Sequence, residues 1–71
     1  MYVDKEIQLR PDLPSGLQRD FQELQEYYEA DDWFMFDTLF EAVEASVKSY
    51  YLVGKISRED LNLIFKKYGI L

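Results

Sequence analysis

The stretch from residue 32 to residue 53, DWFMFDTLFEAVEASVKSYYLV, most constrains how this chain can fold. It contains no Gly or Pro, and its pattern predicts one long helix. Four consecutive large apolar residues, Trp33 to Phe36, would span about 300° of such a helix. They cannot share one face, so a second side of the helix needs cover besides the core.

The two sides differ in composition. At about 100° per residue, one wedge of roughly 120° is the predicted core side. Its members are Trp33, Phe36, Leu39, Phe40, Val43, Val47, Tyr50 and Tyr51. The other side has large apolar residues at its two ends and small residues in its middle. Its candidate interaction residues are Phe34, Met35, Ala42, Ala45, Leu52 and Val53. We expect the N-terminal arm, a second copy of the chain, or both to cover it.

A shorter helix is predicted over residues 15–30, with Ser15 as its N-cap. Its apolar stripe consists of Leu17, Phe21, Leu24 and Tyr28. No Gly or Pro separates it from residues 32–53, so a continuous helix over residues 17–53 stays open. The apolar stripe changes phase across Asp31 and Asp32, which favours a break.

A third helix is predicted over residues 57–68, after a break at Gly54. Ser57 and Asp60 have the spacing of a near capping box, and Gly69 is placed for a left-handed C-terminal cap. The predicted buried stripe is Leu61, Ile64, Phe65 and Tyr68.

Residues 1–14 are predicted to form an extended arm. Residues 6–10 alternate polar and apolar side chains, and Pro11 and Pro14 disfavour helix at the residues before them. The arm either packs Ile7 and Leu9 onto the helices or frays, and the uncovered second side favours packing. The predicted fold is therefore all-α: one small three-helix domain over residues 1–71, built around a long central helix with an extended N-terminal arm.

Composition narrows the function. The 71 residues include no Cys and no His, so disulfides, the usual zinc sites and the commonest catalytic bases and nucleophiles are missing. We expect no enzyme activity, catalytic residue, cofactor or metal site. The net charge of −6 disfavours direct contact with nucleic acid or a membrane. No leader-like or membrane-length apolar run occurs, which predicts a cytoplasmic protein.

Negative charge is concentrated between residues 20 and 44, which hold nine acidic residues and no basic one. The candidate acidic face is Glu23, Glu26, Glu29, Asp37, Glu41 and Glu44. Two Glu-x-x-Glu pairs in this set have the spacing used in di-metal proteins, but they lie off the apolar stripes and no His accompanies them. A solvated acidic face is the expected outcome.

The turn at residues 54–61 resembles two functional motifs only in part. Read as the end of a calcium-binding loop, it would place Ser49, Tyr51 and Val53 where Asp or Asn oxygens are needed. Read as a DNA-binding corner, it would place Glu59 and Asp60 against phosphate. The sequence therefore predicts a small acidic helical bundle that acts as a protein–protein interaction or self-associating module, with a homodimer among the options. The alternative is an acidic inhibitor or nucleic-acid mimic that blocks a basic site on a partner.

Overall fold

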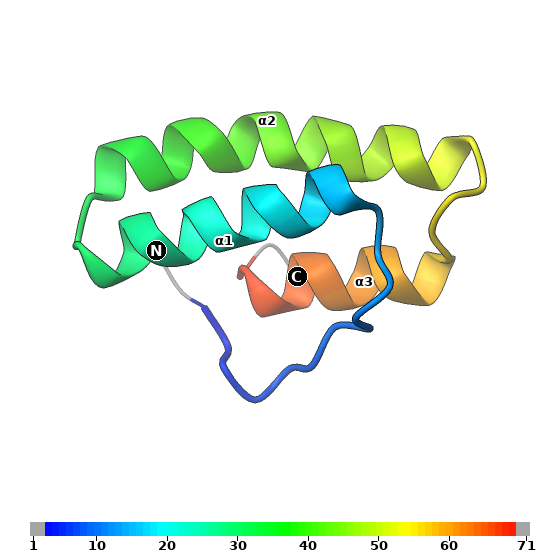
Figure 1. Ribbon diagram of the computed structural model, residues 1–71, viewed down its shortest axis with the longest axis horizontal. Helices are drawn as coiled ribbons and strands as arrows, with labels where there is room; N and C mark the ends of the chain where they lie inside the picture. Colours follow the sequence, from blue (N-terminus) through cyan, green and yellow to red (C-terminus); the bar gives the residue numbers. More distant parts are fainter. Residues whose placement is uncertain (1–2, 70–71) are drawn as a thin grey trace.

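The computed structural model describes residues 3–69, and in that range it contains three α-helices and no strand. Helix α1 runs over Ser15–Glu29, α2 over Trp33–Leu52 and α3 over Arg58–Lys67. The predicted all-α fold is confirmed. Both shorter helices pack against α2, and they lie on the same side of it (Figure 1). Residues 1, 2, 70 and 71, which the predicted domain includes, lie outside the described range.

The chain breaks between α1 and α2 without a glycine. Asp31 takes a positive φ of 55°, a conformation that Asp tolerates better than most residues. Asp32 then caps α2, because its Oδ1 accepts a 3.2 Å hydrogen bond from the N–H of Met35. The predicted break at the two aspartates is therefore present, and a continuous helix over residues 17–53 does not form.

The other helix ends differ in how they are capped. The prediction for Ser15 was wrong: Pro14 is the N-cap of α1, no side chain caps it, and Ser15 lies exposed in the first turn. The capping box of α3 is confirmed. Ser57 Oγ accepts from the N–H of Asp60 at 3.0 Å, and Asp60 Oδ2 accepts from the N–H of Ser57 at 2.9 Å. Gly69 has the expected left-handed φ, 82°.

The core forms where α1 and α3 meet α2. Its buried members on the three helices are Leu17, Leu24, Phe36, Phe40, Val43, Val47, Ile64 and Phe65, and Tyr68 after α3 joins them. The Tyr68 ring has its centroid 5.6 Å from those of Phe21 and Phe40, and 6.4 Å from that of Phe36. Aromatic packing around Tyr68 therefore connects α1, α2 and the end of α3.

The predicted core side of α2 is wrong at Trp33, whose side chain is 54% exposed. Trp33 is the first residue of α2 and lies at the edge of the apolar wedge. Leu39, Tyr50 and Tyr51 are half-buried against the core. The centre of the wedge is therefore buried, and its margins are only partly covered.

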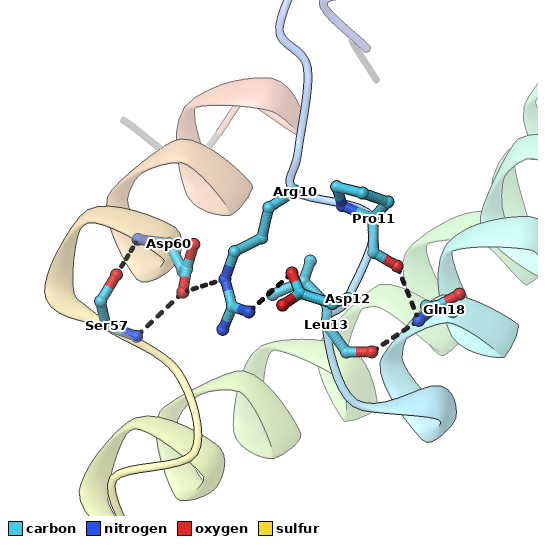
Figure 2. Close-up of polar contacts among 7 residues, drawn as sticks. All are labelled: Arg10, Pro11, Asp12, Leu13, Gln18, Ser57 and Asp60. Atoms are coloured by element: carbon cyan, nitrogen blue, oxygen red, sulfur yellow. Dashed lines mark hydrogen bonds and ion pairs between the residues drawn. The ribbon is translucent and has the colours of Figure 1, made fainter.

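The N-terminal arm lies along α3. At one end, the N–H of Asp4 donates to the carbonyl of Lys67 at 2.7 Å, and Lys67 Nζ donates to the carbonyls of Asp4 and Ile7 at 3.1 and 2.9 Å. At the other end, Arg10 contacts Asp60 in the first turn of α3 (Figure 2). The ribbon shows the arm passing α3 before it turns up into α1 (Figure 1).

The expected docking of the arm is present: Leu9 packs half-buried against the core and Ile7 is half-buried, while Val3 and Leu13 are buried. One expectation is wrong, because the arm does not cover the second side of α2. The arm instead follows α3, where Lys67 pairs with backbone groups of Asp4 and Ile7. An extended segment needs such partners for its backbone, and Asp60 adds a bond to the side chain of Arg10.

Candidate interaction surface

The second side of α2 faces away from α1 and α3, and we call it the outer face. Its members are Phe34, Met35, Thr38, Ala42, Ala45, Ser49, Leu52 and Val53. All eight are exposed, and the six candidate interaction residues of the sequence are among them. Phe34, Leu52 and Val53 are 78%, 80% and 68% exposed, and Met35 is 37% exposed. The structure therefore places these six residues on one uncovered surface.

Local hydrogen bonds hold this surface in helical form. Asp32 fixes the first turn of α2 through Met35, and at the other end the N–H of Val53 donates to the carbonyl of Ser49 at 3.1 Å. Thr38 Oγ1 donates to the carbonyl of Phe34 at 2.8 Å. The hydroxyl of Thr38 thus has its hydrogen-bond acceptor within the helix. A partner that covers the middle of the outer face would not leave this hydroxyl buried without a hydrogen bond.

The outer face has a defined shape. Large side chains stand at its two ends, and Ala42 and Ala45 lie between them. A helix with small residues at its centre allows close approach of a second helix, at interaxial distances toward the lower end of about 8–10 Å. Each apolar side chain covered there would contribute roughly 25 cal/mol per Å2 of area removed from water. The surface is therefore suited to packing against another helix.

The carboxylates of the candidate acidic face are spread over α1 and α2 and do not gather at one site. Glu23, Glu26 and Glu29 are exposed on α1, and Asp37 and Glu41 are exposed on α2. The sixth member, Glu44, is half-buried and accepts from Lys48 Nζ at 3.3 Å. Burial raises the pKa of the adjacent Asp20 above its ordinary value, and the charge of Glu23 adds to this effect.

The carboxylates also form no metal cage. Among residues 3–69, no group of three or more acidic side chains is close enough to hold a metal ion. On the acidic face, Glu29 instead accepts a 3.3 Å hydrogen bond from Gln25, and Glu44 accepts one from Lys48. The arrangement can attract a cationic surface but provides no coordination geometry.

One contact that the sequence did not indicate joins the arm to α3. Arg10 Nε donates to Asp60 Oδ2 at 2.9 Å, and Arg10 Nη1 donates to Asp12 Oδ1 at 2.8 Å (Figure 2). On the α1 side, Gln18 Nε2 donates to the carbonyls of Pro11 and Leu13 at 3.1 and 2.6 Å. Arg10 and Asp60 are fifty positions apart, and no local pattern could have paired them.

An open hollow of about 550 Å3 lies beside this contact. It is lined by Gln8, Leu9, Arg10, Ser57, Glu59, Asp60 and Leu63. The side chains of Arg10 and Asp60 already bind each other there, and Asp60 also closes the capping box with Ser57. These groups hold the arm in place, and we assign the hollow no ligand.

None of the helices within residues 3–69 is both long and apolar enough to cross a membrane. No protein-family model matches the chain, and neither a curated protein nor a solved structure is significantly similar to it.

Proposed function

We propose that this protein is a non-enzymatic protein–protein interaction module whose binding surface is the outer face of α2. The observation that carries the proposal concerns where apolar area is left exposed. Among residues 3–69, five large apolar side chains are exposed, all on α2 or its C-cap, and four of them belong to the outer face: Phe34, Met35, Leu52 and Val53. Singly scattered apolar residues need no explanation, but their concentration on one element is typical of a binding surface.

The rest of the molecule supports the choice of this surface. The core is complete without the outer face, because the inward side of α2 is filled by residues of α1, α3 and the arm. Packing in the core therefore does not explain why Phe34 and Leu52 are large and apolar. A small domain with its own core and one uncovered apolar helix side can fold first and then bind through that side.

The first test places a photo-activatable crosslinking amino acid at Phe34 in cells that express the protein. The control places it at Asn62, an exposed position on α3. We expect one discrete crosslinked product from position 34, which the Ala42→Glu substitution abolishes, and no equivalent product from position 62. Products that are the same at both positions, or that survive Ala42→Glu, would overturn the proposal.

The second test is sedimentation equilibrium of the purified protein with Ala42→Glu and Ala45→Glu. Both alanines are exposed, so circular dichroism should show unchanged helix content. We expect each substitution to weaken association by about tenfold or more, since it places a charge at the centre of an apolar contact. Asn62→Glu adds the same charge on α3 and should leave association unchanged. Association that neither alanine variant weakens would assign the binding surface elsewhere.

A second candidate function is that of an acidic protein that occupies a basic site on a partner. The observation behind it is that five of the six residues of the acidic face are exposed. A crosslinker at Gln22, on the same side of α1 as Glu26 and Glu29, tests it. This function requires a basic crosslinked protein whose yield falls steeply with added salt. If the yield from Gln22 does not depend on salt, this candidate is excluded.

A further inference from the structure

We infer that the occupant of the outer face is a second copy of this chain, packed antiparallel along α2 with a two-fold axis level with the midpoint between Ala42 and Ala45. The inference rests on the proposed function, since it assigns a partner to the same surface. Three features of the outer face carry it: its spacing, its palindromic order and its charged flank.

The spacing is that of a coiled-coil seam. Six exposed residues follow one another at steps of three, four, three, four and three positions: Met35, Thr38, Ala42, Ala45, Ser49 and Leu52. Such an alternation keeps one line of side chains directed at a partner helix. The buried side of α2 has its own residues for contact with α1 and α3, so the seam is an additional packing surface of the same helix.

The sizes of these six side chains follow the same order when the helix is read from either end: large, small, small, small, small, large. In an antiparallel pair centred between Ala42 and Ala45, those two alanines would share a layer, Thr38 would share one with Ser49, and Met35 with Leu52. Both ends of the contact then bring the large residues Phe34 and Met35 onto Leu52 and Val53 of the second copy. The small central layers let the helices approach, and the large end layers bury the side chains that are now most exposed.

Charge decides between the antiparallel and parallel directions. Glu41 and Lys48 are seven residues apart, so they lie on the same flank of the seam, and both are exposed. In an antiparallel pair, residues of one flank face the same flank of the other copy, so Glu41 of each copy would face Lys48 of the other. A parallel pair would instead bring the acidic starts of both α2 helices together, with Asp31, Asp32 and Asp37 of each copy at one end.

A two-fold arrangement also agrees with the position of Lys55. It lies exposed just beyond α2, at the end where the second copy would begin its own helix near Asp32. Each end of the dimer would thus combine an apolar cluster with opposite charges. A surface that is complementary to itself in this way is what an isologous dimer requires.

Disulfide trapping tests the direction, because the chain has no cysteine of its own. Met35→Cys and Leu52→Cys are prepared separately, one isotopically labelled, then mixed and equilibrated in a glutathione buffer. In the antiparallel dimer, the two copies of position 35 are about 25 Å apart, whereas positions 35 and 52 of different copies share a layer. We expect the mixed disulfide to exceed either homodisulfide by about fivefold or more, against twofold for random pairing. Asn62→Cys mixed with Leu52→Cys is the control and should pair at random.

A charge reversal gives an independent measurement. Glu41→Lys and Lys48→Glu each place like charges opposite each other in both copies, so each alone should weaken dimerisation by roughly tenfold. An equimolar mixture of the two variants restores both attractive pairs and should dimerise at least as tightly as the wild type. If the mixture is as weak as the separate variants, the assigned register is overturned.

The outcomes separate this inference from the proposed function. Homodisulfides at positions 35 and 52 would overturn the antiparallel pairing and leave the outer face as the binding surface. A protein that remains monomeric while position 34 crosslinks to a different protein would overturn the second copy as occupant and keep the function. A dimer that Ala42→Glu does not weaken would overturn both.

Discussion

Arg10 Nε donates a 2.9 Å hydrogen bond to Asp60 Oδ2, and the same oxygen accepts the N–H of Ser57 at 2.9 Å. One carboxylate oxygen therefore completes the cap of α3 and also fastens the arm to it (Figure 2). Substitution of Asp60 should loosen both features together, although they are distant in sequence.

The first prediction concerns Asp60→Asn at low pH. Burial opposes ionisation of Asp60, but hydrogen bonds from the Ser57 N–H, Arg10 and the Ser57 hydroxyl outweigh it and hold the pKa of Asp60 below its ordinary 3.8. Because the folded pKa is lowered, ionised Asp60 stabilises the fold above pH 3.8, and this contribution is lost as pH falls through the folded pKa. We expect urea denaturation to show a wild-type advantage over Asp60→Asn at pH 7 that shrinks below about pH 4.

Asp12→Asn is the matched control at neutral pH. Asp12 also binds Arg10, but its side chain is 77% exposed and it caps no helix. Its substitution should reduce stability much less than Asp60→Asn at pH 7. If both substitutions lowered the free energy of unfolding equally, the helix cap and the burial of Asp60 would add no stability beyond that of a surface ion pair.

The second prediction concerns Tyr68 at high pH. Burial raises the pKa of Tyr68 from 10.0 to about 12. Between these values the unfolded chain loses the phenol proton while the folded chain keeps it, so stability falls as pH rises from about 10 and the contribution is gone above about 12. The effect amounts to about 2–3 kcal/mol. Denaturation across this pH range should show a steeper loss in the wild type than in Tyr68→Phe, and parallel curves would contradict the prediction.

The third prediction compares two serines at helix starts. Ser57→Ala removes the side-chain acceptor of the α3 capping box and should lower the free energy of unfolding by about 1 kcal/mol. Ser15→Ala changes an exposed residue in the first turn of α1 that caps nothing, so the effect should stay within about 0.5 kcal/mol. Chemical denaturation of both variants measures the difference. A loss at Ser15 as large as that at Ser57 would contradict the assigned caps.

The fourth prediction concerns the contact between Gly16 and Tyr50. A Cβ added at Gly16 would lie 3.1 Å from the hydroxyl oxygen of Tyr50, closer than ordinary contact. Gly16→Ala should therefore gain little in the wild type, because helix propensity and crowding oppose each other. In a Tyr50→Phe background the crowding is removed, and the same substitution should stabilise by roughly 0.5–1 kcal/mol. A double-mutant cycle measures this coupling, and additive effects would refute it.

Much of the fold could be predicted because its causes are local. The break at Asp31 and Asp32, the cap formed by Ser57 and Asp60, and the turn at Gly69 all depend on residues within four positions of one another. Prediction from local sequence failed where more than one residue could have been the N-cap of a helix. Ser15 had the right chemistry for a cap, but the backbone entered α1 one residue earlier, at Pro14.

The candidate surface could be predicted in part. Helical periodicity alone separated the outer face from the core side, because Phe34 and Leu52 lie more than 100° from the centre of the buried wedge, by about 100° per residue. Periodicity could not indicate how far each wedge is covered. Trp33 belongs to the core side by angle, yet its side chain is exposed in the first turn of α2.

Four large apolar residues in a row cannot share one face of a helix, so the presence of apolar residues on two sides of α2 follows from the sequence. Which of the two sides stays uncovered depends on how the arm and the other helices pack. The arm lies on α3 because Asp60 and Lys67 offer its polar groups hydrogen bonds from residues at least fifty positions away. That choice depends on contacts that no local pattern encodes, and it leaves the outer face of α2 free.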